Sequence, residues 1–180
     1  MREPDAAALR RLLDEREIRD VLTRYCRGID RMDRALVRSC YHEGATDSHG
    51  SFEGTVDEFV AWVWRVLGRY TSTMHFLGNV LVEHVADDVA HVETYGIAFH
   101  HTEGGDARGN LVTGFRYVDD FERRDVDGTP AWRITRRTAV TEWVRVARAE
   151  DAWPIPEGTV TGRRDRSDPV YRDHAARGGR

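Results

Sequence analysis

In the first third of the chain, apolar positions recur every three or four residues, the spacing of one helix face. The longest such segment covers residues 9–29, with apolar positions at Leu9, Leu12, Leu13, Ile18, Val21, Leu22 and Tyr25. Asp33 is suited to cap a short second helix. Thr55 and Glu58 have the spacing of a capping box that begins a third. The pattern therefore predicts three helices.

After Gly68 the period changes from about 3.6 to two, the repeat of a β-strand. Four segments rich in Val, Thr, Tyr, Phe and Trp cover residues 72–84, 88–101, 110–123 and 131–146. Three helices followed by an antiparallel sheet indicate an α+β fold. A chain of 180 residues fits one domain, which we place at residues 1–148. The Pro-, Gly- and charge-rich residues 149–180 are expected to form an extended tail.

Charge and hydropathy exclude several classes of partner. The formal net charge of −4 leaves no broad basic face for nucleic acid. No apolar run approaches the roughly 20 residues of a membrane span. The first residues lack the apolar region of a signal peptide, so we expect a cytoplasmic protein. Cys26 and Cys40 fall in predicted helices and are expected to be buried, reduced thiols.

Residue usage also limits the chemistry. All 27 basic residues are arginine, which excludes lysine Schiff bases and lysine general bases. Arginine stays protonated near neutral pH, so proton transfer falls to His, Asp, Glu, Tyr or Cys. The sequence has no compact HxH or HExxH motif, no GxSxG elbow and no glycine-rich phosphate loop. We therefore expect no metal site.

Asp30 and His75 are the candidate acid–base pair. Each has an ordinary alternative: Asp30 as a solvated carboxylate at a helix end, and His75 as a core or rim residue beside Met74 and Phe76. A buried carboxylate bonded to one imidazole nitrogen fixes the tautomer and raises the basicity of the other nitrogen. If the two side chains meet, they form a general base that works near neutral pH.

Other candidates lie close to this pair or on the strands. Tyr25, five residues before Asp30, is either a half-buried aromatic or a hydroxyl that polarises a substrate oxygen. Arg136 and Arg137 point to opposite faces of a strand, so one of them can enter a pocket as a fixed positive charge. His100 ends a strand and is placed at the pocket or at its rim.

Three motifs together resemble the SnoaL-like family of the NTF2-like superfamily, which includes scytalone dehydratase, lindane dehydrochlorinase and bile-acid 7α-dehydratase. They are the helix motif at residues 18–25 running to Asp30, the strand motif at residues 74–79, and Trp132-Arg133-Ile134 with the arginines after it. The tail residues 167–171 also resemble tails of this group. The likeness covers roughly residues 10–146.

The resemblance implies a cone-shaped α+β barrel, with three helices packed on a curved, mostly antiparallel sheet. It implies an Asp30–His75 dyad, supported by Tyr25 and by Arg137, with Arg136 as second choice, and a strand residue near His100 facing the dyad. It further implies elimination of water or halide without cofactor or metal, and a homotrimer or homodimer.

The chain departs from the scytalone enzyme where that enzyme binds a pocket water. The corresponding positions here are Ser48 or His49, and Phe115 with Tyr117, which argues against the same substrate. Trp62, Phe99, Phe115 and Tyr117 are candidates to line an apolar pocket, although each also fits core packing.

Three hypotheses follow. The leading one is a cofactor-free lyase of the dehydratase type, in which His75 abstracts a proton from a small hydrophobic substrate. The second is an isomerase or polyketide-type cyclase that uses the same dyad. The third is a non-catalytic binding module or the small subunit of an oxygenase, because this fold hosts unrelated functions.

Overall fold

The computed structural model describes residues 5–102, 110–147 and 154–171. Its helices are α1 (Ala6–Asp30), α2 (Arg34–Ser39) and α3 (Val56–Leu67). Its strands are β1 (Tyr41–His49), β2 (Phe52–Thr55), β3 (Ser72–Ala86), β4 (Val89–His101), β5 (Asn110–Val126) and β6 (Thr129–Ala147), with a 3₁₀ turn, η2 (Pro169–Tyr171). The three predicted helices, the four predicted strands and the α+β class are confirmed. The predicted boundary between residues 148 and 149 lies outside the described residues.

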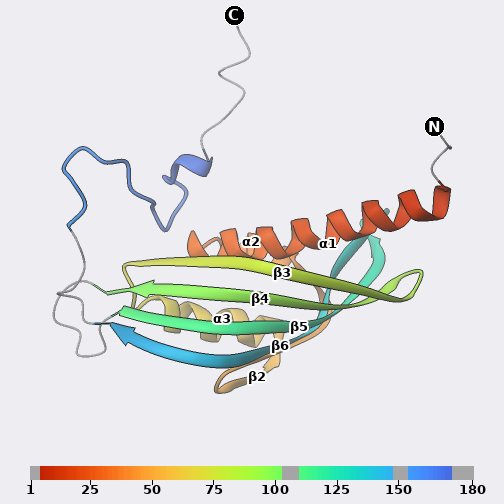
Figure 1. Cartoon of the computed structure of the whole chain (residues 1–180), viewed down its shortest axis with the longest axis horizontal. Coiled ribbons are helices and arrows are strands. Elements are labelled where there is room, and N and C mark those ends of the chain that lie inside the picture. The colour runs from red at the N-terminus through yellow and green to blue at the C-terminus, as the bar shows by residue number, and fades with distance from the viewer. Residues whose placement is uncertain (1–4, 103–109, 148–153, 172–180) are drawn as a thin grey trace, which may run out of the picture.

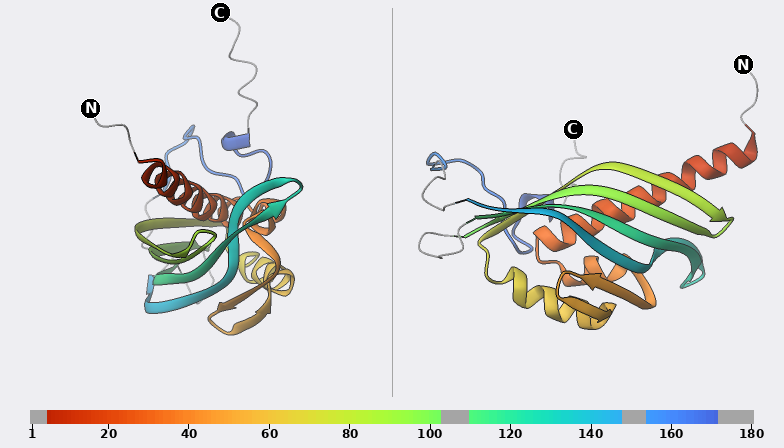
Figure 2. Two further views of the ribbon diagram at one scale, coloured as in Figure 1. Left: turned by 90° about the vertical axis from the view of Figure 1, so that its right-hand side faces the viewer. Right: turned by 60° about the horizontal axis from the view of Figure 1, so that its bottom comes forward.

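The strands form one curved sheet in the order β2-β1-β6-β5-β4-β3 (Figures 1 and 2). The sequence does not predict β1, which carries Glu43, Gly44 and Asp47, residues with low strand propensity, or β2, which has only four residues. β1 pairs in parallel with β6, while the other neighbours pair antiparallel. The edge strands β2 and β3 do not pair with each other, so the sheet is open rather than a closed barrel.

The helices begin where the capping residues predict. Asp33 accepts a hydrogen bond from the Leu36 backbone N–H, and the Thr55–Glu58 capping box is complete. α1 runs along the sheet and projects beyond it at its N-terminal end (Figure 2). The apolar positions from Ile18 to Ile29 are therefore buried. Leu9, Leu12 and Leu13, which continue the same pattern, are exposed by 46%, 64% and 55%.

α1 and α3 pack on the same face of the sheet. The core between these layers is dominated by large side chains with no exposed surface, such as Phe59, Phe121, Trp132 and Ile134. Toward the C-terminal ends of α1 and α3 the packing leaves room for a cavity.

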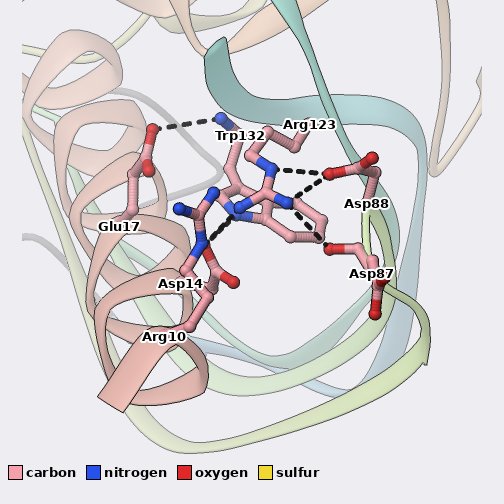
Figure 3. A network of polar contacts seen from close by, with 7 residues as sticks. All are labelled: Arg10, Asp14, Glu17, Asp87, Asp88, Arg123 and Trp132. Carbon is pink, nitrogen blue, oxygen red and sulfur yellow. Dashed lines mark hydrogen bonds and ion pairs between the residues drawn. The ribbon is translucent and has the colours of Figure 1, made fainter. Parts of the chain in front are cut away.

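A polar network fixes α1 to the sheet at the other end (Figure 3). The buried carboxylate of Asp14 accepts hydrogen bonds from Arg123 Nη1 and Trp132 Nε1, both at 3.0 Å. Arg123 also donates from Nε to Asp88, at 2.6 Å, in the β3–β4 turn. Glu17 accepts from the Trp132 backbone N–H at 3.1 Å. One arginine and one tryptophan thus join α1 to β5, to β6 and to the β3–β4 turn.

We expect Asp14→Ala to lower the free energy of unfolding by about 1–3 kcal/mol, because it leaves Arg123 and Trp132 donors buried without their acceptor. Asp20→Ala is the matched control: its carboxylate is 65% exposed and lies 3.9 Å from Arg16, so the change is expected to stay within about 0.5 kcal/mol. Urea unfolding measures both variants. Equal effects of the two substitutions would contradict the role given to Asp14.

Candidate active site

Asp30 ends α1, and His75 lies near the start of β3. Asp30 Oδ1 lies 2.8 Å from His75 Nδ1, and Asp30 Oδ2 accepts a 2.9 Å hydrogen bond from the His75 backbone N–H. Both side chains are more than 90% buried. A carboxylate at Nδ1 holds the proton on that nitrogen, so Nε2 carries the free lone pair. The carboxylate thus fixes both the position and the tautomer of the imidazole.

The turn after α1 positions this carboxylate. α2 packs so closely on α1 that a Cβ on Gly28 would lie 2.6 Å from Val37 Cγ2 and 2.9 Å from its backbone nitrogen. Met32 adopts a left-handed conformation with φ of 54°, and the Asp33 backbone N–H donates to Gly28 O at 2.8 Å. This tight turn ends α1 at Asp30, and the side chain of Asp30 points toward β3.

His75 lines a cavity of about 220 Å³ between the helices and the sheet. α1 contributes Tyr25 and Ile29, α3 contributes Trp62 and its neighbours, and the strands supply the remaining walls. The walls are mostly apolar and aromatic, with a few polar groups, which is typical of small-molecule sites. The sequence candidates that line it are Tyr25, His75, Trp62, His100, Phe115 and Tyr117. Asp30 is not part of the lining and reaches the cavity only through His75.

His100 lies beside the candidate base. Its ring centroid is 5.7 Å from that of His75 and 4.7 Å from that of Tyr70. Burial, and then the proximity of His75, lower the pKa of His100 to about 4. His100 is therefore a neutral imidazole at neutral pH.

The lowered pKa of His100 makes stability depend on pH. The unfolded chain takes up a proton near pH 6.5, whereas folded His100 does so only near pH 4. Stability contributed by the neutral imidazole is therefore present above pH 6.5 and lost as pH falls toward 4. We expect the free energy of unfolding of His100→Gln to decrease less than that of the wild type as the pH falls from 6.5 to 4. Urea unfolding over a pH series measures this difference. The same dependence of unfolding free energy on pH in both proteins would contradict a lowered pKa of His100.

Arg137 points inward but stops behind the cavity wall. Its guanidinium donates to both carboxylate oxygens of Asp119, at 2.8 and 2.7 Å, and neither side chain is exposed. Its Cζ lies 4.2 Å from the ring centroid of Tyr25 and 3.9 Å from that of Tyr117. Burial raises the pKa of Tyr25 well above its usual value, so the hydroxyl stays protonated. Arg137 therefore supports two cavity tyrosines and is not itself in the lining.

Two sequence candidates lie away from the cavity. Arg136 is on the outer face of β6, where Nε donates to Asp120 at 2.7 Å and the side chain is 65% exposed. Phe99 follows the inward-facing Ala98 and so points outward from β4, with 39% exposed. The expectation that they line the pocket is corrected, because strand alternation sends both to the opposite face.

His49 lines the cavity, although the sequence offers it only as an alternative to Ser48. It ends β1 two residues after Asp47, and strand alternation turns both side chains inward. Asp47 is fully buried and accepts a 2.7 Å hydrogen bond from the Tyr41 hydroxyl. Recognising residues 41–49 as a strand would have revealed this second His–Asp combination.

The described part of the tail, residues 154–171, meets the ends of α1 and α3. Arg164 donates to the backbone carbonyls of Leu67, at 2.9 Å, and of Tyr70. Arg31 forms a 3.1 Å ion pair with Asp168. The tail is thus packed next to the wall that contains Leu67 and His100.

Cys26 and Cys40 are free and buried, as predicted. Burial raises the pKa of Cys26 to about 12 and that of Cys40 to about 11, so neither forms a thiolate at neutral pH. Within residues 5–102, 110–147 and 154–171, no three His, Cys, Asp or Glu side chains converge as a metal site. Over the same described ranges, no helix combines the length and apolar character needed to cross a membrane.

Comparison with known families identifies the domain. The SnoaL-like domain profile matches residues 10–138, which is well over half of the chain, so the protein belongs to the SnoaL-like family. A search of curated proteins finds no match.

Solved structures show the same fold at low sequence identity. A proposed scytalone dehydratase from Novosphingobium aromaticivorans shares 20% identity with a TM-score of 0.66, and the alignment covers 84% of this chain and 98% of that one. A type 2 hexachlorocyclohexane dehydrochlorinase, LinA, shares 19% identity with a TM-score of 0.71 over 84% and 99% of the two chains. A Mycobacterium tuberculosis protein of unknown function shares 20% identity with a TM-score of 0.61 over 73% of each chain. The predicted NTF2-like cone is confirmed.

Proposed function

We propose that the protein is a cofactor-free lyase of the dehydratase type that acts on a small hydrophobic molecule. The observation that carries the proposal is the Asp30–His75 pair, which presents an imidazole to a largely apolar cavity. An imidazole oriented in this way by a carboxylate is able to act as a general base. The dehydrochlorinase and the proposed scytalone dehydratase among the structural neighbours add support for elimination chemistry.

In the proposed reaction, Nε2 of His75 removes a proton from an acidic C–H of the substrate. The electron pair of that bond forms a C=C bond and expels the leaving group on the adjacent carbon. Asp30 stabilises the imidazolium that results. Tyr25 lines the cavity as a protonated hydroxyl and donates to the oxygen on which negative charge develops. Arg137 contributes indirectly, because it holds the Tyr25 and Tyr117 rings from behind.

An isomerase or cyclase is the second candidate. Besides His75, His100 and His49 also line the cavity, and a second imidazole is able to return a proton to another carbon. The non-catalytic alternative does not account for a base held by two hydrogen bonds at an open cavity. The expected homodimer or homotrimer stays a prediction.

Product mass separates the candidates. The protein is incubated with a panel of cyclic β-hydroxy ketones of one or two rings, and products are analysed by mass spectrometry. The proposed lyase yields products lighter by one water, whereas an isomerase yields products of unchanged mass. Unchanged starting material throughout the panel would contradict an enzyme for this substrate class.

A further inference from the structure

Asp47 and His49 form a second carboxylate–imidazole combination in the wall of the cavity. Asp47 Oδ1 lies 3.4 Å from His49 Nδ1. Neither atom has a hydrogen-bond partner within the described residues, although both are buried. The other oxygen of Asp47 is held by Tyr41, so a small rotation of the imidazole is enough to form an Nδ1–H bond to Oδ1. That bond would leave Nε2 of His49 free to face a ligand, as in the Asp30–His75 pair.

His49 and His75 occupy opposite walls of one cavity. His49 is on β1 and His75 on β3, with β6, β5 and β4 between them. An aromatic wall joins the two: ring centroids are 6.3 Å apart from His75 to Phe115, 4.5 Å from Phe115 to Tyr117, and 5.9 Å from Tyr117 to His49. Engineered apolar cavities of roughly 150 Å³ bind benzene. A cavity of about 220 Å³ therefore suits a molecule of one or two rings lying along this wall between the imidazoles.

The charges around the cavity determine how a leaving group departs. Among the described residues, the ionisable groups of the lining are three histidines and two tyrosines, with no arginine or carboxylate. Arg137 lies behind the tyrosines and is neutralised by Asp119, so no fixed cation faces a departing hydroxide. Hydroxide must then leave as water, which needs a proton donor. Burial raises the pKa of Tyr25 and of Tyr117 well above the usual value, so these hydroxyls donate hydrogen bonds but are poor proton donors. His75 serves as the base and His100 stays neutral near pH 7, which leaves His49 for that role.

We infer that His49 is the general acid of this site, oriented by Asp47, and that it protonates the oxygen leaving group of a substrate of one or two rings. The inference rests on the proposed function and deepens it. His75 removes the proton from carbon, the C=C bond forms as the C–O bond breaks, and the His49 imidazolium transfers its Nε2 proton to the departing oxygen. Water is released, His75 returns its proton to solvent, and His49 takes one up.

Leaving-group dependence tests this role without knowledge of the natural substrate. The probes are 4-phenoxybutan-2-one and 4-(4-nitrophenoxy)butan-2-one. Phenoxide is the more basic leaving group, so its departure depends more on protonation than that of nitrophenoxide. We expect His49→Gln to lower elimination of the phenoxy probe by roughly 10²-fold and to leave the nitrophenoxy probe within about threefold of wild type. His49→Phe, which keeps the ring contact with Phe59, is expected to behave the same way.

The controls separate this role from a structural one. His91→Gln, in an exposed His–Asp pair on the outer face, is expected to leave both probes unchanged. Equal losses on both probes in the His49 variants, or no loss on either, would overturn the general-acid role while His75 remains essential. A wild-type protein that eliminates neither probe would contradict the proposed function itself, and the general-acid role with it.

Discussion

Replacing His75 by alanine is expected to lower kcat/KM for elimination of 4-(4-nitrophenoxy)butan-2-one by roughly 10²–10⁴-fold. This probe needs no acid, so its rate reports proton abstraction alone. Asp30→Asn is expected to cause a loss of similar size, because an amide no longer stabilises the imidazolium and can favour the other tautomer. In serine proteases the corresponding Asp-to-Asn change lowers kcat by about 10⁴-fold with the geometry intact.

The chain offers a matched control for this prediction. His91 Nδ1 lies 2.6 Å from Asp120 Oδ1 in a pair of the same chemistry that faces away from the cavity. His91→Gln and Asp120→Asn are therefore expected to keep the wild-type rate. Circular dichroism and thermal unfolding check that all four variants are folded. Wild-type rates for folded His75→Ala and Asp30→Asn would contradict the assignment of the base.

Removing the carboxylate of Asp119 is expected to cause the largest loss of stability. The Arg137–Asp119 pair is fully buried and bidentate, with the guanidinium against the Tyr25 and Tyr117 rings. Removing one partner of a buried pair typically costs about 3–5 kcal/mol, because an uncompensated charge stays in the core. Asp119→Ala leaves Arg137 in this position, and we expect a decrease of about that size in the free energy of unfolding by urea.

The double replacement distinguishes charge burial from packing. Combining Asp119→Leu with Arg137→Leu removes both charges, and buried ion pairs replaced by apolar residues are often neutral in stability. We therefore expect the double variant to be more stable than Asp119→Ala. Its activity should still fall, because Tyr25 and Tyr117 lose the group that supports their rings. A double variant less stable than the single one would show that packing, not charge, dominates at this position.

The sequence predicts the fold well where periodicity is strong. The apolar repeat of α1 from Ile18 onward, the capping box of α3 and the alternation of β3–β6 all appear as expected. The sequence does not predict β1, which is rich in polar and small residues, or β2, which has four residues. It also fails for the exposed leucines of α1, because how far a helix extends past the sheet depends on tertiary packing.

The same limit applies to the site. Spacing alone does not predict that Asp30 meets His75; the resemblance to the SnoaL-like family implies this contact, and the structure contains it. The sequence offers Phe99 and Arg136 as pocket candidates because alternation shows that neighbouring strand residues face opposite sides, but not which of them faces the helices. The sequence offers His49 only as an alternative to Ser48, because residues 41–49 show no clear strand pattern. The cation expected in the pocket proved to be a buried support, since the position of Arg137 depends on Asp119 across the sheet.

The central claim is that His75 removes a proton from carbon inside the cavity. Deuterium incorporation from D₂O into 4-phenylbutan-2-one, a ketone with no leaving group, is followed by proton NMR at neutral pD and measures this step directly, because proton exchange beside the carbonyl is then the only reaction that the base can catalyse. We expect wild type and His49→Gln to exchange the protons beside the carbonyl, and His75→Ala to show only the uncatalysed rate. Exchange by His75→Ala at the wild-type rate, or no catalysed exchange by the wild type, would contradict the account.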